Sequence, residues 1–275
     1  MKTRRILALV LVVALMACMM VGCSKSSSSS AASSSKLDQI LKAGTIKIGV
    51  NPGGVPICYY DDSGKLCGYD VDWANKLGEV LGVKVEFVTV DGETRISAIQ
   101  SGQVDVIFAN ITGNLERAQV ISFSIPYLKT GIKMLTAKGS NYHVIDDLNT
   151  PDATIAVDRG TTSEAMVLEH CPKANLTYVA GSEDAVLLVL QGKADATFED
   201  GTLIDYSAGQ YSDKLESQPT VYTSDPICIG TARGDADWLR YLDMFVSWQI
   251  SNGFQADRYS YWWGTDFTGT LEHPW

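Results

Sequence analysis

The sequence has few of the residues from which common enzyme sites are built. Of its 275 residues only three are histidines, His143, His170 and His273, and they stand far apart in the chain. It contains no CxxC, GxGxxG or P-loop pattern, and therefore no zinc, redox, dinucleotide or nucleotide-phosphate signature. A Ser-His-Asp triad needs a histidine next to the serine and the aspartate, and the sequence does not indicate such a position for any of the three histidines. We therefore predict no metal and no cofactor.

Positive charge is also scarce. Lys and Arg total 22 against 32 Asp and Glu, for a formal net charge of -10, and basic residues cluster only within the first five positions. Because a phosphate-binding surface needs clustered Lys and Arg, this balance excludes nucleic acid as a partner. The remaining composition, with 45% hydrophobic residues, is that of a globular chain with one large or two small domains.

The N-terminus holds a long hydrophobic run. Residues 6–22 are almost entirely apolar and follow Lys2, Arg4 and Arg5, which is the pattern of an export signal. Met20-Val21-Gly22-Cys23 resembles the lipobox of bacterial lipoproteins, with Met20 in place of the usual Leu. The alternative is an uncleaved membrane anchor, since the run is just long enough to span a bilayer.

The lipobox resemblance implies that residues 1–22 are a lipoprotein signal peptide and that Cys23 carries the lipid, with palmitate among its acyl chains. The lipidated Cys23 and the Ser-rich stretch after it, residues 23–36, then form a flexible tether, because this stretch has nothing to bury. We expect the fold to begin near Lys36.

Four cysteines remain beyond the tether. Cys58 and Cys67 flank the sequence Asp-Asp-Ser-Gly at residues 61–64. If residues 62–63 form a two-residue hairpin loop, the two thiols lie directly opposite, within disulfide reach. A glycine bulge at Gly64 would shift that register, so both the bridged and the reduced state stay open. Cys171 and Cys228 are predicted to be buried thiols.

From residue 36 onward, short β-rich segments alternate with helical patterns, which predicts an α/β fold. Strands are predicted at 45–50, 83–90, 104–110, 154–157 and 194–198, with a hairpin formed by 57–60 and 65–69. Helices are predicted from a cap at Asp70, from Thr94, from Ser163 and over 184–191. The apolar face of the Asp70 helix consists of Val71, Ala74, Leu77 and Leu81.

Two stretches of the chain match in kind. SGQVDVIFAN at 101–110 and QGKADATFED at 191–200 share a glycine, a strand and a polar end. The match predicts two α/β lobes on one plan, although any helix that ends in glycine before a buried strand looks similar. Strand carboxyl ends face the ligand crevice in open α/β sheets. Residues 51–54, 110–112, 158–162 and 199–200 should therefore meet in a cleft.

These strand ends supply one cation, one anion and several hydroxyls, a set that suits a small zwitterion. Arg117 follows Asn114, a potential helix cap, and its planar guanidinium can hold a carboxylate with two hydrogen bonds. Asp200 can accept an ammonium group, and Thr161 and Thr162 open the second-lobe helix. The alternatives are an ordinary surface arginine for Arg117 and helix capping for the other three.

The sequence resembles the polar amino-acid solute-binding proteins of bacterial ABC importers, family 3. GYDVDWANKLGEVL at 68–81 is similar to the family signature, with Trp73 where an aliphatic residue or Phe is usual. Residues 101–127 resemble the central stretch of the family, DRGTTSE at 158–164 its second-lobe ligand loop, and GKADATFED at 192–200 its acidic motif. The similarity spans about residues 36–264.

The resemblance implies a two-lobed α/β fold of the type II periplasmic-binding-protein kind, with two hinge strands. The first lobe would hold residues 37–127 plus 228–267 and the second residues 132–222, with hinges near 127–131 and 223–227. It further implies a monomer that is not an enzyme, anchored by lipid to the extracytoplasmic face of the cell membrane, at the cell surface or in the periplasm. Its partners would be an amino acid and an ABC permease of the inner membrane.

The resemblance also implies roles for individual residues. Arg117 would bind the ligand α-carboxylate with Thr112 and the backbone near Asn110, and Asp200 the α-ammonium, with help from Thr161 and Thr162. Arg95 falls where acidic amino-acid binders place a side-chain-binding arginine, but Asn51 replaces a second arginine of that subgroup and Ser182 its histidine. We expect a small polar or acidic amino acid, with glutamate, aspartate and cysteine open.

Two other functions remain as alternatives. Exported cyclohexadienyl dehydratases resemble this family, and Glu199 or Glu164 would then act as an acid in the cleft. A receptor-like sensor module is the second alternative, which a transmembrane or signalling segment after the domain would favour.

Overall fold

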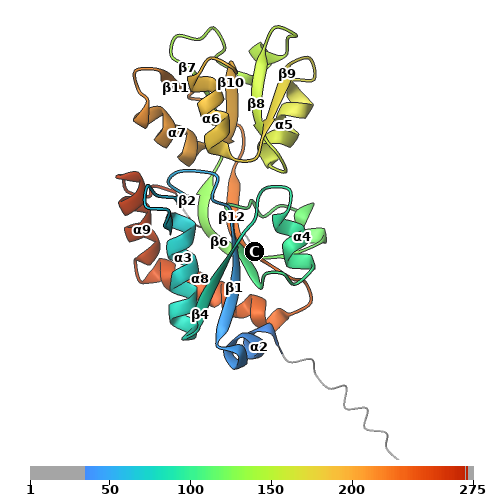
Figure 1. Cartoon of the computed structure of the whole chain (residues 1–275), viewed down its shortest axis with the longest axis vertical. Helices are drawn as coiled ribbons and strands as arrows, with labels where there is room; N and C mark the ends of the chain where they lie inside the picture. Colours follow the sequence, from blue (N-terminus) through green and yellow to red (C-terminus); the bar gives the residue numbers. More distant parts are fainter. Residues whose placement is uncertain (1–34, 270, 272–275) are drawn as a thin grey trace, which may run out of the picture. The chain divides into compact units, whose positions relative to one another are not determined.

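Two five-stranded sheets organise the described part of the chain, residues 35–269 and 271, in the computed structural model (Figure 1). The predicted signal peptide, the lipidation site Cys23 and tether residues 23–34 lie outside the described residues. Among the residues described, no helix combines the length and the apolar character that crossing a bilayer requires.

The first sheet has the strand order β4-β1-β5-β12-β6. Its strands are β1 (Thr45–Val50), β4 (Lys84–Thr89), β5 (Val106–Phe108), β6 (Ser122–Thr130) and β12 (Asp225–Thr231). β1 is parallel to β4 and β5, and β12 is antiparallel to β5 and β6. The accompanying helices are α2 (Lys36–Ala43), α3 (Tyr69–Leu81), α4 (Arg95–Gln100), the 3-10 turn η1 (Arg117–Gln119), α8 (Ala236–Ser251) and α9 (Phe254–Trp263). We call this sheet and these helices the first lobe.

The second sheet has the order β11-β7-β10-β8-β9. Its strands are β7 (Ile132–Ala137), β8 (Thr154–Asp158), β9 (Asn175–Val179), β10 (Ala196–Asp200) and β11 (Leu215–Ser217). The helices with it are η2 (Ile145–Leu148), α5 (Thr162–His170), α6 (Ser182–Leu190) and α7 (Gly201–Gln210). This second lobe shares with the first a run of parallel strands separated by helices, so the prediction of two α/β lobes is confirmed.

The chain passes between the sheets twice. β6 ends at Thr130 and β7 begins at Ile132, and the return falls between β11 and β12. The residue between β6 and β7, Gly131, packs against the carbonyl of Thr223 on the returning segment. The two crossings therefore lie side by side at Gly131 and Thr223.

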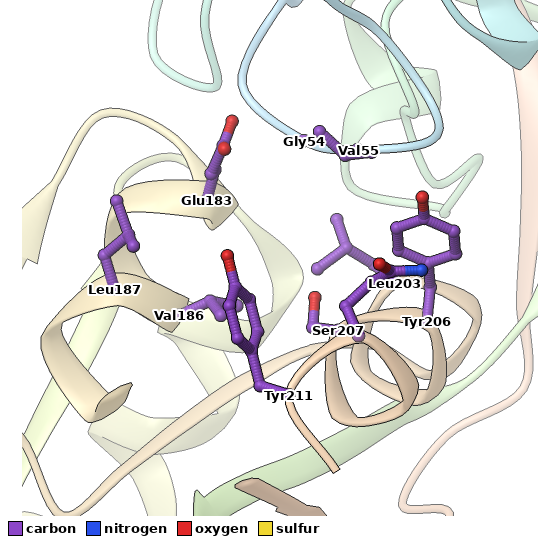
Figure 2. A pocket seen from close by; sticks show the side chains of 10 residues that line it. Gly54, Val55, Glu183, Val186, Leu187, Leu203, Tyr206, Ser207 and Tyr211 are labelled. Carbon is purple, nitrogen blue, oxygen red and sulfur yellow. The ribbon is translucent and has the colours of Figure 1, made fainter. Parts of the chain in front are cut away.

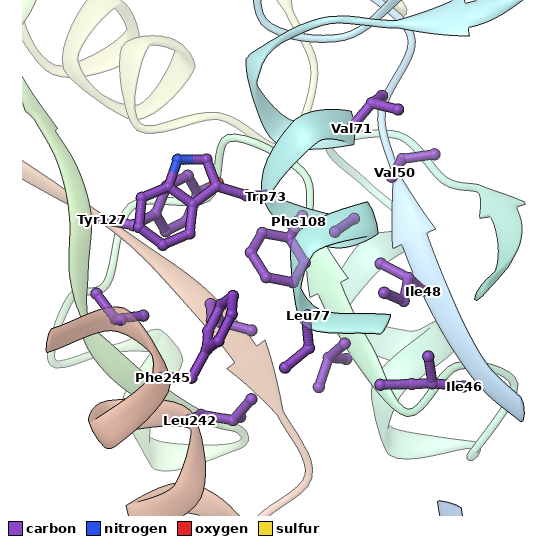
Figure 3. Packing of buried hydrophobic residues seen from close by; sticks show 14 of the residues in the cluster. Ile46, Ile48, Val50, Val71, Trp73, Leu77, Phe108, Tyr127, Leu242 and Phe245 are labelled. Atoms are coloured by element: carbon purple, nitrogen blue, oxygen red, sulfur yellow. The ribbon is translucent and has the colours of Figure 1, made fainter. Parts of the chain in front are cut away.

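The core of the first lobe lies between α3 and the sheet (Figure 3). The four predicted apolar positions of α3 are buried, which confirms that face: Val71, Ala74, Leu77 and Leu81. Trp73 packs among aromatic rings, with its ring centroid 5.2 Å from that of Tyr127. Burial of each such ring removes roughly 150–250 Å² of surface from water and fixes the helix on the sheet.

Asp70 does not cap α3 as predicted. Gly68 occupies the position before the helix, and Asp70 lies inside the first turn, fully buried. Its carboxylate accepts hydrogen bonds from the Tyr127 hydroxyl at 2.7 Å and from the Asn110 N–H at 2.8 Å. These two hydrogen bonds, from residues distant in the sequence, satisfy the buried carboxylate better than capping of its own helix would. They also connect α3 to the segment that follows β5.

The hairpin adopts the bulged register, one of the two left open by the sequence. β2 (Tyr59–Tyr60) pairs with β3 (Leu66–Cys67) so that Tyr59, not Cys58, lies opposite Cys67. Gly64 has φ +79, and the N–H of Asp61 donates to the carbonyl of Lys65, which is the glycine-bulge loop left open above. The thiols of Cys58 and Cys67 are free, and Cys171 and Cys228 are buried as predicted.

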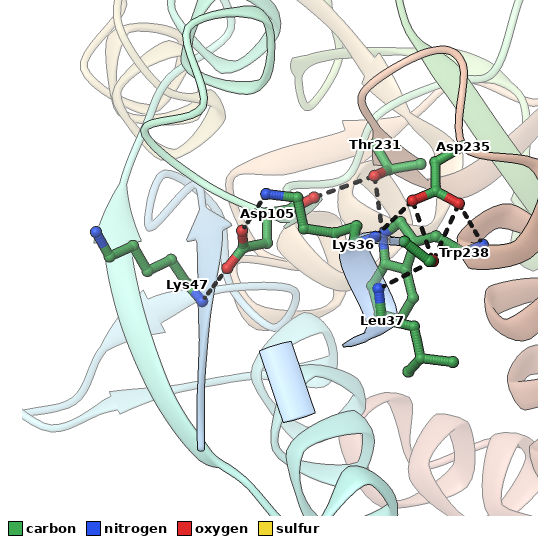
Figure 4. Close-up of polar contacts among 8 residues, drawn as sticks. Lys36, Leu37, Lys47, Asp105, Thr231, Asp235 and Trp238 are labelled. Carbon is green, nitrogen blue, oxygen red and sulfur yellow. Dashed lines mark hydrogen bonds and ion pairs between the residues drawn. The ribbon is translucent and has the colours of Figure 1, made fainter. Parts of the chain in front are cut away.

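Polar contacts join Lys36, at the start of α2, to residues near β5 and α8 (Figure 4). The N–H of Lys36 donates to Asp235 at 2.5 Å, and its ammonium forms an ion pair with Asp105 at 3.0 Å. Asp235 also accepts from the N–H of Trp238 at 2.9 Å and so caps α8. The beginning and the end of the first lobe are thereby joined.

Candidate functional site

The carboxyl ends of strands from both sheets meet around one pocket. It is lined by Asn51, Arg95, Asn110, Thr112, Asp158, Thr161, Thr162, Ser163, Ser182, Glu199 and Asp200. The predicted ligand-binding residues are therefore brought together, with Arg117 the exception, since it does not line this pocket directly. The pocket joins strand ends of β1, β5, β8 and β10 as sheet topology requires.

Arg117 lies beside this pocket. The Asn114 carboxamide accepts its N–H at 2.9 Å, although the segment is a 3-10 turn rather than the expected helix. Its guanidinium donates to the carbonyl of Thr112 at 3.1 Å and, across the lobes, to that of Gly160 at 3.0 Å. Burial lowers the pKa of Arg117 from its ordinary value. This residue is thus no ordinary surface arginine, because it spans both lobes.

Arg95 is buried more deeply, with 4% of its surface exposed. Its guanidinium donates to the carbonyls of Ala109 at 2.8 Å, Asn110 at 3.3 Å and Gly160 at 3.2 Å. Burial, followed by the charge of Arg117, lowers the pKa of Arg95 to about 10, so the side chain stays cationic at neutral pH. Backbone carbonyls thus occupy both terminal nitrogens of Arg95.

Asn110 and Asp200 form the direct side-chain link between the lobes. Asn110 has φ +46, a left-handed conformation that asparagine tolerates better than most residues. Its amide nitrogen donates to Asp200 Oδ2 at 2.6 Å. Asp200 makes no capping bond to α7, so helix capping does not account for it. Burial raises the pKa of Asp200 to about 7, against the opposing effect of the Asn110 bond.

The hydroxyl of Thr161 caps a helix. It accepts the N–H of Glu164 at 3.1 Å and donates to the carbonyl of Asp158 at 2.8 Å. Thr161 therefore has the structural role proposed as the alternative, while it also lines the pocket. Thr162 begins α5 beside it, and the Glu164 carboxylate accepts the N–H of Gly160 at 2.7 Å.

Four pocket residues were not among the predicted ligand-binding set: Asp158, Ser163, Ser182 and Glu199. β8 and β10 are parallel with Thr197 opposite Ala156, so the same register places Glu199 beside Asp158 on one face. Both strands end in polar residues after a buried run, a signal that predicts the region of the site but not that Asp158 and Glu199 are paired. Only strand pairing makes the two carboxyl groups neighbours.

The electrostatics of this pair follow from its burial. Asp158 and Glu199 are 4% and 5% exposed, and the Ser182 hydroxyl donates to Asp158 at 3.5 Å. Burial raises the pKa of both carboxyl groups, and for Glu199 the charges of Asp158 and Asp200 raise it further. Two carboxyl groups this close in a low-dielectric site cannot both ionise without cost, and the charge of Arg95 opposes that effect.

Glycines bring the lobes into close contact around the pocket. A Cβ at Gly92 would overlap the carbonyl oxygen of Arg159, and one at Gly53 would lie 3.0 Å from the Cα of Gly181. Across the same gap the N–H of Glu183 donates to the carbonyl of Gly53 at 2.8 Å. The glycines at these positions thus allow direct backbone contact between the lobes.

A second, larger pocket lies between Gly54, α6 and α7 (Figure 2). Its side chains are mostly aliphatic and aromatic, with Glu183 as the ionisable carboxylate and no Lys or Arg among them. It therefore lacks the paired opposite charges of the first pocket. In the part of the chain that is described, no cluster of three or more His, Cys, Asp or Glu could hold a metal ion.

Comparison with known proteins gives consistent matches. Residues 46–265 match the bacterial extracellular solute-binding proteins, family 3. A glutamate/aspartate import solute-binding protein of Escherichia coli is 30% identical over 181 residues, 62% of this chain and 59% of that protein, so the match spans less than two thirds of its length. A cyclohexadienyl dehydratase of Pseudomonas aeruginosa is 24% identical over 246 residues, 88% of each chain.

A solved structure matches in three dimensions. The ancestral amino acid-binding protein AncCDT-1, described as a precursor of cyclohexadienyl dehydratase, superposes with a TM-score of 0.78 at 31% identity. The superposition covers 83% of this chain and 100% of that one.

Proposed function

The chain belongs to the bacterial extracellular solute-binding proteins, family 3, and from this membership we propose that it binds an amino acid in the pocket around Asp200. Its fold is that of the type II periplasmic binding proteins. The relatives named above include both amino-acid binders and an enzyme, so the binding role and the choice of ligand are argued from the site itself.

One observation carries the proposal. A buried carboxyl group, Asp200, and a guanidinium, Arg117, come from different lobes and flank one pocket. An amino acid presents an ammonium and a carboxylate on neighbouring atoms, and it can therefore join the two lobes electrostatically. Because these contacts exist only when the lobes are together, ligand favours the closed arrangement.

The same geometry suggests how the lobes move. We propose the boundaries expected from the sequence, residues 37–127 plus 228–267 for one lobe and 132–222 for the other, with hinges near 127–131 and 223–227. The support is that the two crossings are adjacent, with Gly131 packed on Thr223. Rotation about such a pair of strands opens the pocket without breaking either sheet.

A thermal-shift screen of the purified chain against the twenty amino acids tests the proposal. A ligand that binds only the folded state raises the melting temperature, by an amount that grows with concentration over Kd. We expect one or a few amino acids to raise it, and Asp200→Asn to abolish the rise, while Asp205→Asn, an exposed carboxylate on α7, keeps it. If no amino acid changes the melting temperature of the wild-type protein, the proposed function is wrong.

We further propose that the protein acts outside the cytoplasm as a lipoprotein and monomer that passes its ligand to an ABC permease. The support is family membership together with the sequence of residues 1–23. Growth of an expressing bacterium on labelled palmitate should label the wild-type protein and not the Cys23→Ser variant. Label on neither form would leave the uncleaved anchor as the explanation of the hydrophobic run.

A dehydratase activity is a second candidate, favoured by Glu199. This carboxyl group is buried in the cleft with a raised pKa, as a general acid requires, and a dehydratase is among the relatives. Incubation of the purified chain with prephenate or arogenate would release an aromatic product if the candidate is right. Product formed by wild type and lost in Glu199→Gln would replace the binding proposal with an enzymatic one.

A further inference from the structure

Three buried polar atoms around the pocket have no hydrogen-bond partner: Arg95 Nε, Asn110 Oδ1 and Glu199 Oε1. Such atoms are rare in folded proteins, because a buried polar group without a partner has lost its water and gained nothing in return. Their concentration around one pocket, with Glu199 and Arg95 over nine-tenths buried, indicates that a ligand completes them. Their positions therefore describe the chemistry of that ligand.

Arg95 is held by backbone carbonyls from both lobes. Its terminal nitrogens donate to the backbone carbonyls of Ala109, Asn110 and Gly160, and its Nε–H has no partner. Arg95, whose position in the sequence suggested an acidic ligand, therefore has a structural role as a donor to the carbonyls of Ala109 and Gly160.

The charges around the same end of the pocket are predominantly negative. Asp158, Glu199 and Asp200 line it, against Arg95 as the single basic side chain in the lining. After Asp200 pairs with the ligand ammonium, Asp158 and Glu199 still outnumber Arg95. A further carboxylate would enter a buried site where carboxyl groups outnumber basic side chains, and Arg95 alone would have to offset the loss of its hydration.

Asp158, Ser182 and Glu199 form one surface of the pocket, which we call the acidic subsite. It is built from the end of β8, the start of α6 and β10, all in the second lobe. It offers the free acceptor Glu199 Oε1 beside the Asp158 carboxylate. Asn51, from the facing lobe, adds a neutral amide to the lining.

We propose that the acidic subsite binds a positively charged side chain, so that the ligand is a cationic amino acid. This inference rests on the proposed function and replaces the small polar or acidic ligand expected from the sequence. A ligand cation at Glu199 would pair with the carboxylate form and satisfy the orphaned oxygen. The charges in the lining would then balance, with Asp158 facing Arg95.

Calorimetry with the purified chain tests the inference, with L-ornithine, L-lysine and L-arginine against L-glutamate, L-aspartate and L-glutamine. We expect the best cationic amino acid to bind about a hundredfold or more tightly than either acidic one, since like charges juxtaposed in a buried site repel strongly. If an acidic or neutral amino acid binds most tightly, the acidic subsite is wrongly assigned while the proposed function stands. If none of the twenty amino acids and L-ornithine binds, the proposed function itself fails.

Two matched variants test whether the preference for a cationic amino acid arises in the acidic subsite. Glu199→Gln should lower affinity for the preferred cationic amino acid by about tenfold or more, because it removes the charge but keeps the shape. Glu183→Gln, an exposed carboxylate at the second pocket, should change it less than about twofold, as expected for a charge outside the buried site. Melting temperatures of both variants without ligand confirm that they fold. Unchanged affinity in a folded Glu199→Gln protein would overturn the subsite.

Discussion

The amide of Asn110 reaches across the cleft and donates to the carboxyl group of Asp200 at 2.6 Å. Asn110 follows shortly after β5 of the first sheet, and Asp200 ends β10 in the second. The same Asn110 is held from behind, because its N–H donates to the buried Asp70. A chain of polar contacts therefore runs from the core beneath α3 to the group expected to bind an ammonium.

Removal of the Asn110 side chain should open the ligand-free molecule. Asn110→Gly keeps the left-handed backbone without strain and deletes a hydrogen bond to a charged group, worth about 1.5–3 kcal/mol in the closed arrangement. Small-angle scattering should give a larger radius of gyration for the ligand-free variant than for wild type. Asn141→Gly, at an exposed position in a loop, is the control and should leave the radius unchanged. Identical radii for all three proteins would count against a closing role for this bond.

Arg117→Ala should lower the affinity for the amino acid about a hundredfold or more. The substitution leaves the ligand carboxylate desolvated and unpaired, at a cost of about 2–5 kcal/mol. Calorimetry with the preferred amino acid measures the loss. Arg240→Ala, on the exposed side of α8, should bind like wild type. Wild-type affinity in Arg117→Ala would show that the carboxylate is held elsewhere.

Gly92→Ala should weaken ligand binding and leave the fold intact. Its φ lies outside the left-handed range, so the methyl group is harmless until the lobes meet, where it overlaps the Arg159 carbonyl. We expect affinity to fall about tenfold or more while the circular-dichroism spectrum stays that of wild type, since about 1.4 kcal/mol of strain is tenfold in affinity. Gly209→Ala, within α7 and with open space around it, is the control. A full-affinity Gly92→Ala protein would mean that the ligand-bound lobes do not approach this closely.

The ligand-free protein should lose stability as pH rises toward neutrality. The pKa of Asp200 is raised from 3.8 to about 7 in the fold, chiefly by burial and then by the charge of Asp225, against Asn110, Arg95 and Arg117. Its protonated form therefore stabilises the native state fully below 3.8, and this contribution is lost as pH rises through about 7.

The free energy of unfolding should fall by about 2–4 kcal/mol between about pH 5 and pH 8 from this group, because a pKa that differs by one between the folded and unfolded states corresponds to about 1.4 kcal/mol. Denaturant titrations at several pH values measure the fall. Asp200→Asn should have a flatter profile than wild type. Parallel profiles for the two proteins would contradict the raised pKa.

Reduction should not destabilise the protein. The offset register of the hairpin leaves the Cys58 and Cys67 thiols free, and burial raises the pKa of Cys58 above its ordinary value. Melting temperatures with and without dithiothreitol should agree within about 1 °C, whereas loss of a native bridge would cost about 2–5 kcal/mol. Peptide mapping that finds residues 58 and 67 linked would refute the prediction.

Much of the fold could be predicted because local patterns agree with the tertiary outcome. Strand 45–50 coincides with β1, and the apolar face of α3 is buried as its spacing indicates. The elements that failed depend on partners far along the chain. Asp70 looks like a cap from its neighbours alone, but Tyr127 and Asn110 hold its carboxylate in the core. The sequence permits two loops at Gly64, one with a bulge and one without. A register difference of one residue between them decides whether Cys58 or its neighbour lies opposite Cys67.

The sequence by itself determined the class of the protein and the region of its site. Alternation of strand and helix, together with polar residues at strand ends, is enough to place a cleft, because parallel strands present their carboxyl ends at one edge of a sheet. Only the tertiary structure decided which side chains line that cleft and which of their hydrogen-bonding groups remain unpaired. Arg95 donates from both terminal nitrogens to backbone carbonyls, and Glu199 becomes the neighbour of Asp158 through strand pairing. Burial and pairing set the charge that a ligand meets, and neither can be read from a residue's own position in the chain.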